Sequence, residues 1–428
     1  MTSTARRPAA TDPAADAPAE DTWLPEPPVL HSPWHTPQRA ALQEQARRFA
    51  MDEVLPVANE LDPQKGEIPQ HLLERLGELG YFGITIPAED GGLGLGVFEY
   101  CMVAEELARA WMSVASIPAR SQGMGTSVAD ADRRRELLRR SAAGSWIGAV
   151  ALSEPDAGSD LANVQTRAVR EGDEWVVTGH KRWCGNAKAA DFIQVLVRVA
   201  DPQPGESRSR GLRNLLLTKD RGSFPAGLSG YPIDKVGYHG FLTWDLTFDG
   251  VRIPADDLIV EAGDDARGDG DSGAGFREAQ KFLNTARVHT AARAVGLARA
   301  AVEDSVLYLQ EREQFGHPIG DFQALRFALA DMAAQVEQAR SFYRQVAHLL
   351  DEGVPCEREA AMVKLQATEM AVRVTNQAMQ LHGGNGYTTE RQVERHWRDA
   401  RLTTIFEGTS EIQKRIISNA MLPRSPLS

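Results

Sequence analysis

Glu407, near the C-terminus, stands where a general base could work. It follows two apolar residues and precedes Gly408. An apolar setting desolvates a carboxylate and makes it a better proton acceptor, while a glycine leaves room for a ligand to approach. Thr409 or Ser410 can cap a helix that begins here. A glutamate beside a helix start is more often a capping or surface residue, so these residues alone leave both interpretations open.

A second group of residues suits an anion such as a phosphate. Gly383, Gly384 and Gly386 permit close approach of the backbone to a ligand. The guanidinium of Arg312 matches a phosphate in charge and in geometry. The alternatives are a plain turn between helices for the glycines and a surface ion pair for Arg312. The pattern therefore permits a phosphate site without requiring one.

The composition is typical of a globular protein with more than one domain. The 428 residues are 42% hydrophobic and 25% charged, with a formal net charge of -12. This acidic balance argues against nucleic-acid binding. A membrane span is not expected, because the chain has no apolar run of about 18 residues. The three cysteines lie far apart and form no C-x-x-C pair, which favours a reducing cytoplasm and no metal site.

A tail and a helical part open the chain. Residues 1–33 are rich in Ala, Pro, Asp and Glu and lack an apolar signal segment, which predicts a disordered tail. Thr36 then serves as a helix N-cap before a proline. Helical spacing recurs in three segments, which are 36–55, 70–79 and 97–111. We therefore expect a helical domain over residues 34–149.

From about residue 150 the period of the apolar pattern changes. Four runs typical of strands lie between clusters of Gly, Pro and Asp, at 175–177, 192–199, 212–218 and 244–253. We expect a β domain over residues 150–265. An acidic, glycine-rich loop is expected to follow it at 263–275.

The last part, 275–428, is predicted to be helical. Its helical segments are 276–313, 321–352, 356–382 and 410–421. Short connections between long helices are typical of an antiparallel bundle. The order helical, β, helical predicts an α+β multidomain fold and argues against a parallel doubly wound sheet.

Four segments that could carry chemistry occur together. They are ALSEPDAGSD (151–160), GHKRWCGNA (179–187), EREQFGHPI continuing to FQ (311–323), and QLHGGNGY continuing through RDAR to IFEGTS (380–410). In this order, the chain closely resembles the acyl-CoA dehydrogenase family over residues 36–422. The resemblance implies a helical N-terminal domain, a β-barrel-like middle domain and a C-terminal four-helix bundle. It also implies non-covalent FAD and a homotetramer arranged as a dimer of dimers.

The resemblance makes Glu407 the base that removes the pro-R α-proton of an acyl thioester while the β-hydrogen leaves as hydride to the flavin. Some members carry the base on the first bundle helix, directly before an arginine. Here Ala286 precedes Arg287. Alanine cannot accept a proton, so Glu407 is the candidate that remains. In this family the flavin ribityl hydroxyl and the backbone N–H of the base polarise the acyl carbonyl.

The resemblance also implies which residues hold FAD. Leu152, Ser153 and Ser159 match positions that line flavin and substrate. Trp183 looks like the aromatic side chain that packs near the isoalloxazine, although a core tryptophan that closes the β domain is the alternative. Six residues are expected to hold the pyrophosphate and adenosine, partly across a subunit interface: Arg312, Phe315, Gln323, Gln380, Gly383 and Gly384. Thr409, beside the base, completes the expected cofactor contacts.

One residue departs from the family pattern. After the tryptophan, relatives commonly have Ile-Thr-Asn or Ile-Ser-Asn, and the hydroxyl bonds the flavin. This chain has Cys184, Gly185 and Asn186 instead. Gly185 has no hydroxyl, which puts the flavin's tuning and its reactivity with oxygen in question.

Five residues are expected to contact the substrate: Arg109, Ser113, Arg120, Asn284 and Arg287. Arg109 and Ser113 resemble the carboxylate-binding stretch of glutaryl-CoA dehydrogenases. The segments around Arg120 and over 285–293 resemble methylsuccinyl-CoA dehydrogenases. A buried guanidinium needs an anionic partner, such as a carboxylate at the far end of the acyl chain. If both arginines instead lie on a solvated helix face, a short or branched aliphatic acyl group is expected.

We therefore expect FAD-dependent α,β-dehydrogenation of a short acyl-CoA, with dicarboxylic acyl groups included. Electrons are expected to pass to an electron-transfer flavoprotein. The alternatives are a flavin oxidase or monooxygenase, an enzyme acting on acyl carrier protein thioesters, and a non-catalytic scaffold.

Overall fold

The computed structural model describes residues 34–259 and 274–422. The tail predicted for 1–33 lies outside the described residues. So does the loop predicted from Gly263, except that Ala274 and Gly275 already belong to a helix.

The N-terminal part is helical, as predicted. Helix α1 (Pro37–Arg48) begins where expected, with the Thr36 hydroxyl accepting a hydrogen bond from the Arg39 backbone N–H. It continues through a π-helical turn (Phe49–Val54) into helix α2 (Leu55–Leu61). The other helices of this part are α3 (Gln70–Glu78), α4 (Val97–Ala110), α5 (Met112–Ala115) and α6 (Ala131–Ala142).

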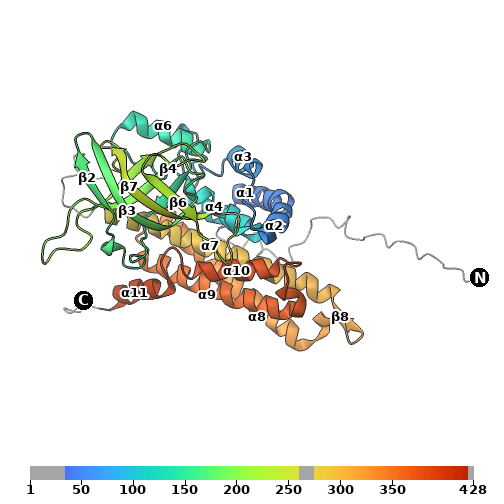
Figure 1. The fold of residues 1–428 in the computed structure, drawn as a ribbon. Helices are drawn as coiled ribbons and strands as arrows, with labels where there is room; N and C mark the ends of the chain where they lie inside the picture. Colours follow the sequence, from blue (N-terminus) through green and yellow to red (C-terminus); the bar gives the residue numbers. More distant parts are fainter. Residues whose placement is uncertain (1–33, 260–273, 423–428) are drawn as a thin grey trace, which may run out of the picture.

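The middle part is a curled, mixed sheet of seven strands (Figure 1). The strands are β1 (Gly148–Ala151), β2 (Arg167–Glu171), β3 (Glu174–Gly185), β4 (Phe192–Arg198), β5 (Leu212–Thr218), β6 (Leu228–Pro232) and β7 (Thr243–Pro254). Their order is β1-β4-β2-β3-β7-β6, and β5 pairs with β4. β3 and β7 pair antiparallel with two irregularities in register, one of them between Lys181 and Cys184.

The C-terminal part is a helical bundle. Its elements are helix α7 (Ala274–Glu311), a hairpin of β8 (Glu313–Gln314) and β9 (His317–Pro318), and helices α8 (Gln323–Asp351), α9 (Glu357–His382), α10 (Val393–Thr403) and α11 (Ser410–Met421). Helices α7 to α10 pack together as the four-helix bundle, and α11 lies against α9. The predicted α+β fold, with helical outer parts and a β middle part, is thus confirmed.

The two helical parts share one hydrophobic core, while most of the sheet packs around its own. Helix α4 lies against α7 at close range. A Cβ placed on Gly296 of α7 would lie 2.4 Å from the backbone oxygen of Glu105 on α4. No residue larger than glycine fits there without moving a helix, so this position sets how closely α4 and α7 approach.

An ion-pair cluster joins all three parts. Asp62 of the N-terminal part accepts from Nη2 of Arg398 on α10 at 2.6 Å, and its backbone oxygen lies 3.1 Å from Nδ1 of His239 in the β6–β7 loop. Asp62 is fully buried. These contacts hold the β6–β7 loop against both helical parts, beside the turn that carries Glu407.

Candidate active site

Glu407 lies in the turn between α10 and α11, with a φ of +54°. A positive φ is uncommon for a residue with a Cβ and persists where the surroundings hold it. The carbonyl oxygen of Gly408 accepts from Lys364 Nζ at 2.7 Å and from Gln413 Nε2 at 2.9 Å. Thr409, one of the two caps that the sequence offered, caps α11. Lys364 of α9 and Gln413 of α11 thus both hold the backbone of the turn. The Glu407 side chain itself is half-buried.

Positive side chains surround this turn. Lys364 is fully buried, and burial lowers its pKa to about 8, against the opposing influence of Glu407. Burial also lowers the pKa of Arg287, whose Nη1 donates to Asn284 Oδ1 at 2.6 Å. The backbone N–H of Glu407 has no hydrogen-bond acceptor among the described residues. It can therefore donate to the carbonyl oxygen of a bound molecule.

Trp183 lies on the surface of the middle part rather than in its core. It sits at the irregularity in β3 with a φ of +68°, and 55% of it is exposed. The neighbouring backbone N–H of Arg182 donates to the Ser153 oxygen at 2.8 Å. The Arg182 guanidinium carbon lies 4.8 Å from the centre of the ring, and the exposed part of the ring can pack on a planar ligand. This exposure removes the alternative of a core tryptophan.

Lys181 supports the same region from inside the sheet. Its fully buried Nζ donates to the Leu152 oxygen and to Glu154 Oε1, both at 2.9 Å. Burial lowers the pKa of Lys181 to about 8. The strand that carries Trp183 and the segment that carries Leu152 and Ser153 are thereby held together, with Ser159 exposed further along.

Packing explains the glycine at position 185. A Cβ placed on Gly185 would lie 2.4 Å from Cε1 of Phe241, closer than side-chain atoms approach. The Phe241 ring is itself buried. Replacement of the family's hydroxyl residue thus makes room for an aromatic ring beside the strand.

The residues expected to hold the pyrophosphate and adenosine gather at one end of the bundle. Tyr308, four residues before Arg312, stacks on His382 at a ring distance of 4.4 Å and accepts from Asn385 Nδ2 at 2.9 Å. This joins the end of α7 to the glycine turn after α9. All six expected residues are exposed: Arg312, Phe315, Gln323, Gln380, Gly383 and Gly384.

This end of the bundle is remote from Glu407. Lys364 contacts the Glu407 turn, and Gln380 follows 16 residues later on the same helix. A rise of 1.5 Å per residue puts the two about 24 Å apart. One chain therefore presents the expected cofactor residues in two separate groups.

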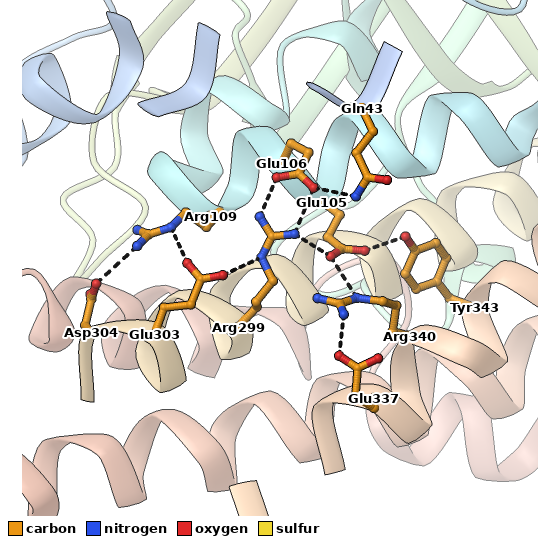
Figure 2. A network of polar contacts seen from close by, with 10 residues as sticks. All are labelled: Gln43, Glu105, Glu106, Arg109, Arg299, Glu303, Asp304, Glu337, Arg340 and Tyr343. Atoms are coloured by element: carbon orange, nitrogen blue, oxygen red, sulfur yellow. Dashed lines mark hydrogen bonds and ion pairs between the residues drawn. The ribbon is translucent and has the colours of Figure 1, made fainter. Parts of the chain in front are cut away.

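Arg109 and Ser113 are occupied by partners within the chain, which revises the role expected for them. Arg109 Nε donates to Glu303 at 2.8 Å, and Nη2 lies 3.3 Å from Asp304 (Figure 2). The Ser113 hydroxyl donates to the backbone oxygen of His239. Because α4 presents Arg109 toward α7, its positive charge is already paired.

Arg120 is placed differently from Arg109. It has no ion pair among the described residues, and its guanidinium carbon lies 5.3 Å from the centre of the Phe241 ring. Sequence reasoning missed its neighbour Arg293, which is buried on α7 within the segment 285–293. The helix segment around 285–293 is largely apolar, and it contains Arg293 as well as Arg287. A second arginine in such a segment was the sequence signal that could have indicated a buried charge near the site.

No helix of the described residues is long and apolar enough to cross a membrane. The same residues contain no group of three or more His, Cys, Asp or Glu side chains placed to hold a metal ion.

Three family models match the chain in the order of its three parts. They describe the N-terminal domain of acyl-CoA dehydrogenase (residues 36–145), the middle domain (149–251) and the C-terminal domain (273–422). The chain therefore belongs to the acyl-CoA dehydrogenase family. Members of this family are oxidoreductases that act on the CH–CH bond of acyl-CoA and bind FAD.

Individual relatives match over almost the whole chain. A probable acyl-CoA dehydrogenase of Bacillus subtilis is 37% identical, covering 90% of this chain and 98% of the relative. A (2S)-methylsuccinyl-CoA dehydrogenase of Cereibacter sphaeroides is 36% identical, covering 89% and 69%. The structure of butyryl-CoA dehydrogenase from Megasphaera elsdenii superposes with a TM-score of 0.82 at 31% identity, covering 91% and 99%.

Proposed function

We propose that this protein dehydrogenates a short acyl-CoA thioester at its α and β carbons, with Glu407 as the base. The observation that supports this most is the Glu407 turn. It presents a half-buried carboxylate and a free backbone N–H at one point, and Lys364 and Gln413 hold its backbone.

The turn can perform both parts of a proton abstraction. The carboxylate of Glu407 takes the α-proton. The backbone N–H of the same residue donates to the thioester oxygen, where negative charge develops as the proton leaves. Arg287 and Lys364 add positive charge close to this carboxylate. Ala286 supplies no competing base.

The residues present fit FAD. The exposed ring of Trp183 can pack against a planar ligand, and a Cβ on Gly383 or Gly384 would meet no atom within 4 Å, so the glycine turn is open to a phosphate. When bound, FAD supplies the acceptor for the β-hydrogen. Leu152, Ser153, Ser159 and Thr409 belong to the group near Trp183 and Glu407 in this proposal.

The separation of the two cofactor groups supports a site shared between subunits. Phe315 and Tyr387 are 90% and 82% exposed at the end of the bundle that carries Arg312. Apolar side chains this exposed are typical of a surface that another protein covers. We propose that a second copy covers them, within the homotetramer that the family resemblance implies.

The electron acceptor and the location of the protein come from the sequence. The family resemblance makes an electron-transfer flavoprotein the proposed acceptor, and the cysteine usage predicts a cytoplasmic location. The oxidase alternative rested on Gly185. The packing of Phe241 explains why residue 185 is a glycine, so that residue no longer favours an oxidase.

A dicarboxylic acyl group keeps support from Arg120 but not from Arg109.

Replacing the base tests the proposal. The variant Glu407→Gln should fold, keep its flavin and bind acyl-CoA, yet lose flavin reduction by substrate by at least about 10²–10⁴-fold. The measurement is anaerobic bleaching of the flavin by a panel of short acyl thioesters. Bleaching at the wild-type rate would show that another residue takes the proton.

A further inference from the structure

Two arginines from different parts of the chain approach the Glu407 turn. Arg293 of α7 is only 3% exposed, and its guanidinium carbon lies 5.0 Å from the centre of the Phe406 ring, the residue before the base. Arg120 ends a short helical turn (Pro118–Arg120) of the N-terminal part and lies against Phe241. The site thus holds two positive charges beside the reacting position.

Aromatic side chains connect the two arginines. Tyr238 lies between them, with its ring centre 5.0 Å from that of Phe241 and 6.2 Å from that of Phe406. Tyr238 and Phe241 belong to the β6–β7 loop and are buried with the helical core. Arg120, Arg293 and the three rings therefore form one cluster, which we call the arginine cluster.

Within residues 34–259 and 274–422, neither arginine has a carboxylate partner. Among the described residues Arg293 donates only to hydroxyl groups, from Nη1 to Ser116 at 2.7 Å and from Nη2 to Thr290 at 3.0 Å. The side chain of Arg120 makes no hydrogen bond there, and the buried Nε atoms of both arginines lack partners. Arg109, by contrast, has two carboxylates.

Besides Glu407, whose charge acts on Tyr238 together with the charges of both arginines, the cluster is bordered by His289, which supplies no negative charge. His289 stacks on Tyr100 at a ring distance of 4.3 Å. Burial and the charges of Arg293 and Arg120 hold the pKa of His289 well below its usual range, so its ring is neutral. Arg293 is buried and Arg120 is half-buried, and neither has a counter-charge among the described residues. A guanidinium group out of water without an anion is costly, so two at one place indicate that an anion completes the cluster.

We infer that Arg120 and Arg293 bind a carboxylate carried at the far end of the acyl chain. This inference rests on the proposed function, because it places the thioester end of the same substrate at Glu407. The carboxylate receives charge-assisted hydrogen bonds from the two guanidinium groups, and Ser116 and Thr290 keep Arg293 oriented.

The position of the cluster limits the length of the acyl chain. Arg293 lies over the ring of the residue next to the base, so only a few bonds separate the reacting carbons from the anion site. A carboxylate on a four- or five-carbon backbone spans this gap. A longer aliphatic chain would place methylene groups against two charged side chains and leave both unpaired.

Pairs of thioesters that differ only in the carboxylate test the inference on the wild-type holoenzyme. Methylsuccinyl-CoA is compared with 2-methylbutyryl-CoA, and glutaryl-CoA with valeryl-CoA, by anaerobic flavin reduction. We expect kcat/KM to favour the carboxylate member of at least one pair by about 10²-fold or more. Preference for the neutral member in both pairs would overturn the inference and leave the proposed function intact. Reduction by no thioester would instead overturn the proposed function.

Variants of the two arginines test whether these residues cause the preference for a carboxylate substrate. Arg120→Met and Arg293→Met should each lower kcat/KM for the preferred carboxylate substrate by about 10²-fold, and should lower kcat/KM for its neutral counterpart by a smaller factor. Arg139→Met, on an exposed face of α6, is the matched control. If Arg293→Met does not fold, Arg120→Met decides, because the Arg120 side chain makes no hydrogen bond within the described residues. A preference unchanged in Arg120→Met overturns the assignment.

Discussion

The buried ammonium of Lys364 on α9 donates a hydrogen bond of 2.7 Å to the carbonyl oxygen of Gly408, one residue beyond Glu407. This bond fixes a turn in which Glu407 has a left-handed backbone conformation. Lys364 therefore acts on the proposed base in two ways, by holding its backbone and by adding a nearby positive charge.

Replacing Lys364 by methionine should slow proton abstraction without loss of the cofactor. We expect kcat to fall about tenfold or more, because the carboxylate is less well placed. Lys414→Met, an exposed residue of α11, is the control. An unchanged kcat in Lys364→Met would reduce Lys364 to a packing residue.

Arg299→Met should destabilise the fold. Arg299 pairs with Glu105, Glu106 and Glu303 in the buried network between α4 and α7 (Figure 2). Its removal leaves buried carboxylates without a counter-charge, which typically costs about 3–5 kcal/mol. Denaturant unfolding measures the loss, and Arg167→Met, from an exposed ion pair, should change little. Equal effects of the two variants would contradict a structural role for the network.

Arg312→Ala should weaken flavin retention rather than stability. Arg312 is exposed and its side chain makes no ion pair among the described residues, so little folding energy depends on it. If it binds the cofactor pyrophosphate across a subunit interface, dilution should release flavin from the variant before the wild type. Gel filtration with absorbance of the flavin measures this. Full flavin content after dilution would make Arg312 an ordinary surface charge.

The Asp62 cluster should make stability depend on acid pH. Asp62 is buried, yet hydrogen bonds from His239 and the charge of Arg398 lower its pKa from 3.8 to about 2. A carboxylate with a depressed folded pKa stabilises the fold above its unfolded pKa, and the contribution disappears as pH falls through the folded value. It amounts to about 2 kcal/mol. Asp62→Asn should therefore be less stable than wild type at neutral pH, with the difference shrinking between pH 3.8 and about 2. A difference independent of pH would contradict this.

Periodicity predicted several long elements closely, but it missed helices α6 and α10, most of strand β3 and the short strands. Helices α8 and α9 and strand β5 fall within two residues of their predicted bounds. The strands β1, β2 and β6 have only four or five residues, too few to show a period, and β6 has a mostly exposed pattern. Their place depends on pairing with neighbours distant in sequence.

Some features of the candidate site could be predicted from local sequence, and others depend on tertiary packing. Local sequence offered Thr409 or Ser410 as the cap of α11, because a helix cap is a local feature. The role expected for Glu407 came from the family resemblance, since local sequence left a capping or surface role open. The partner of Arg109 could not be predicted from local sequence, because Glu303 lies 194 residues away and only tertiary packing decides which face of α4 meets α7. The same packing left Arg120 unpaired beside Arg293.

The separation of paired charges along the chain has a consequence for synthesis on the ribosome. Glu105 emerges 194 residues before Arg299 and 235 residues before Arg340, its two cationic partners. At about 5–20 residues per second, α4 waits roughly 10–40 s for the first of them. The sheet, whose strands follow one another between the two helical parts, can fold during that interval. Until α7 is made, the nascent N-terminal helices lack the helix that covers the apolar face of α4 and the arginine that pairs with Glu105 and Glu106.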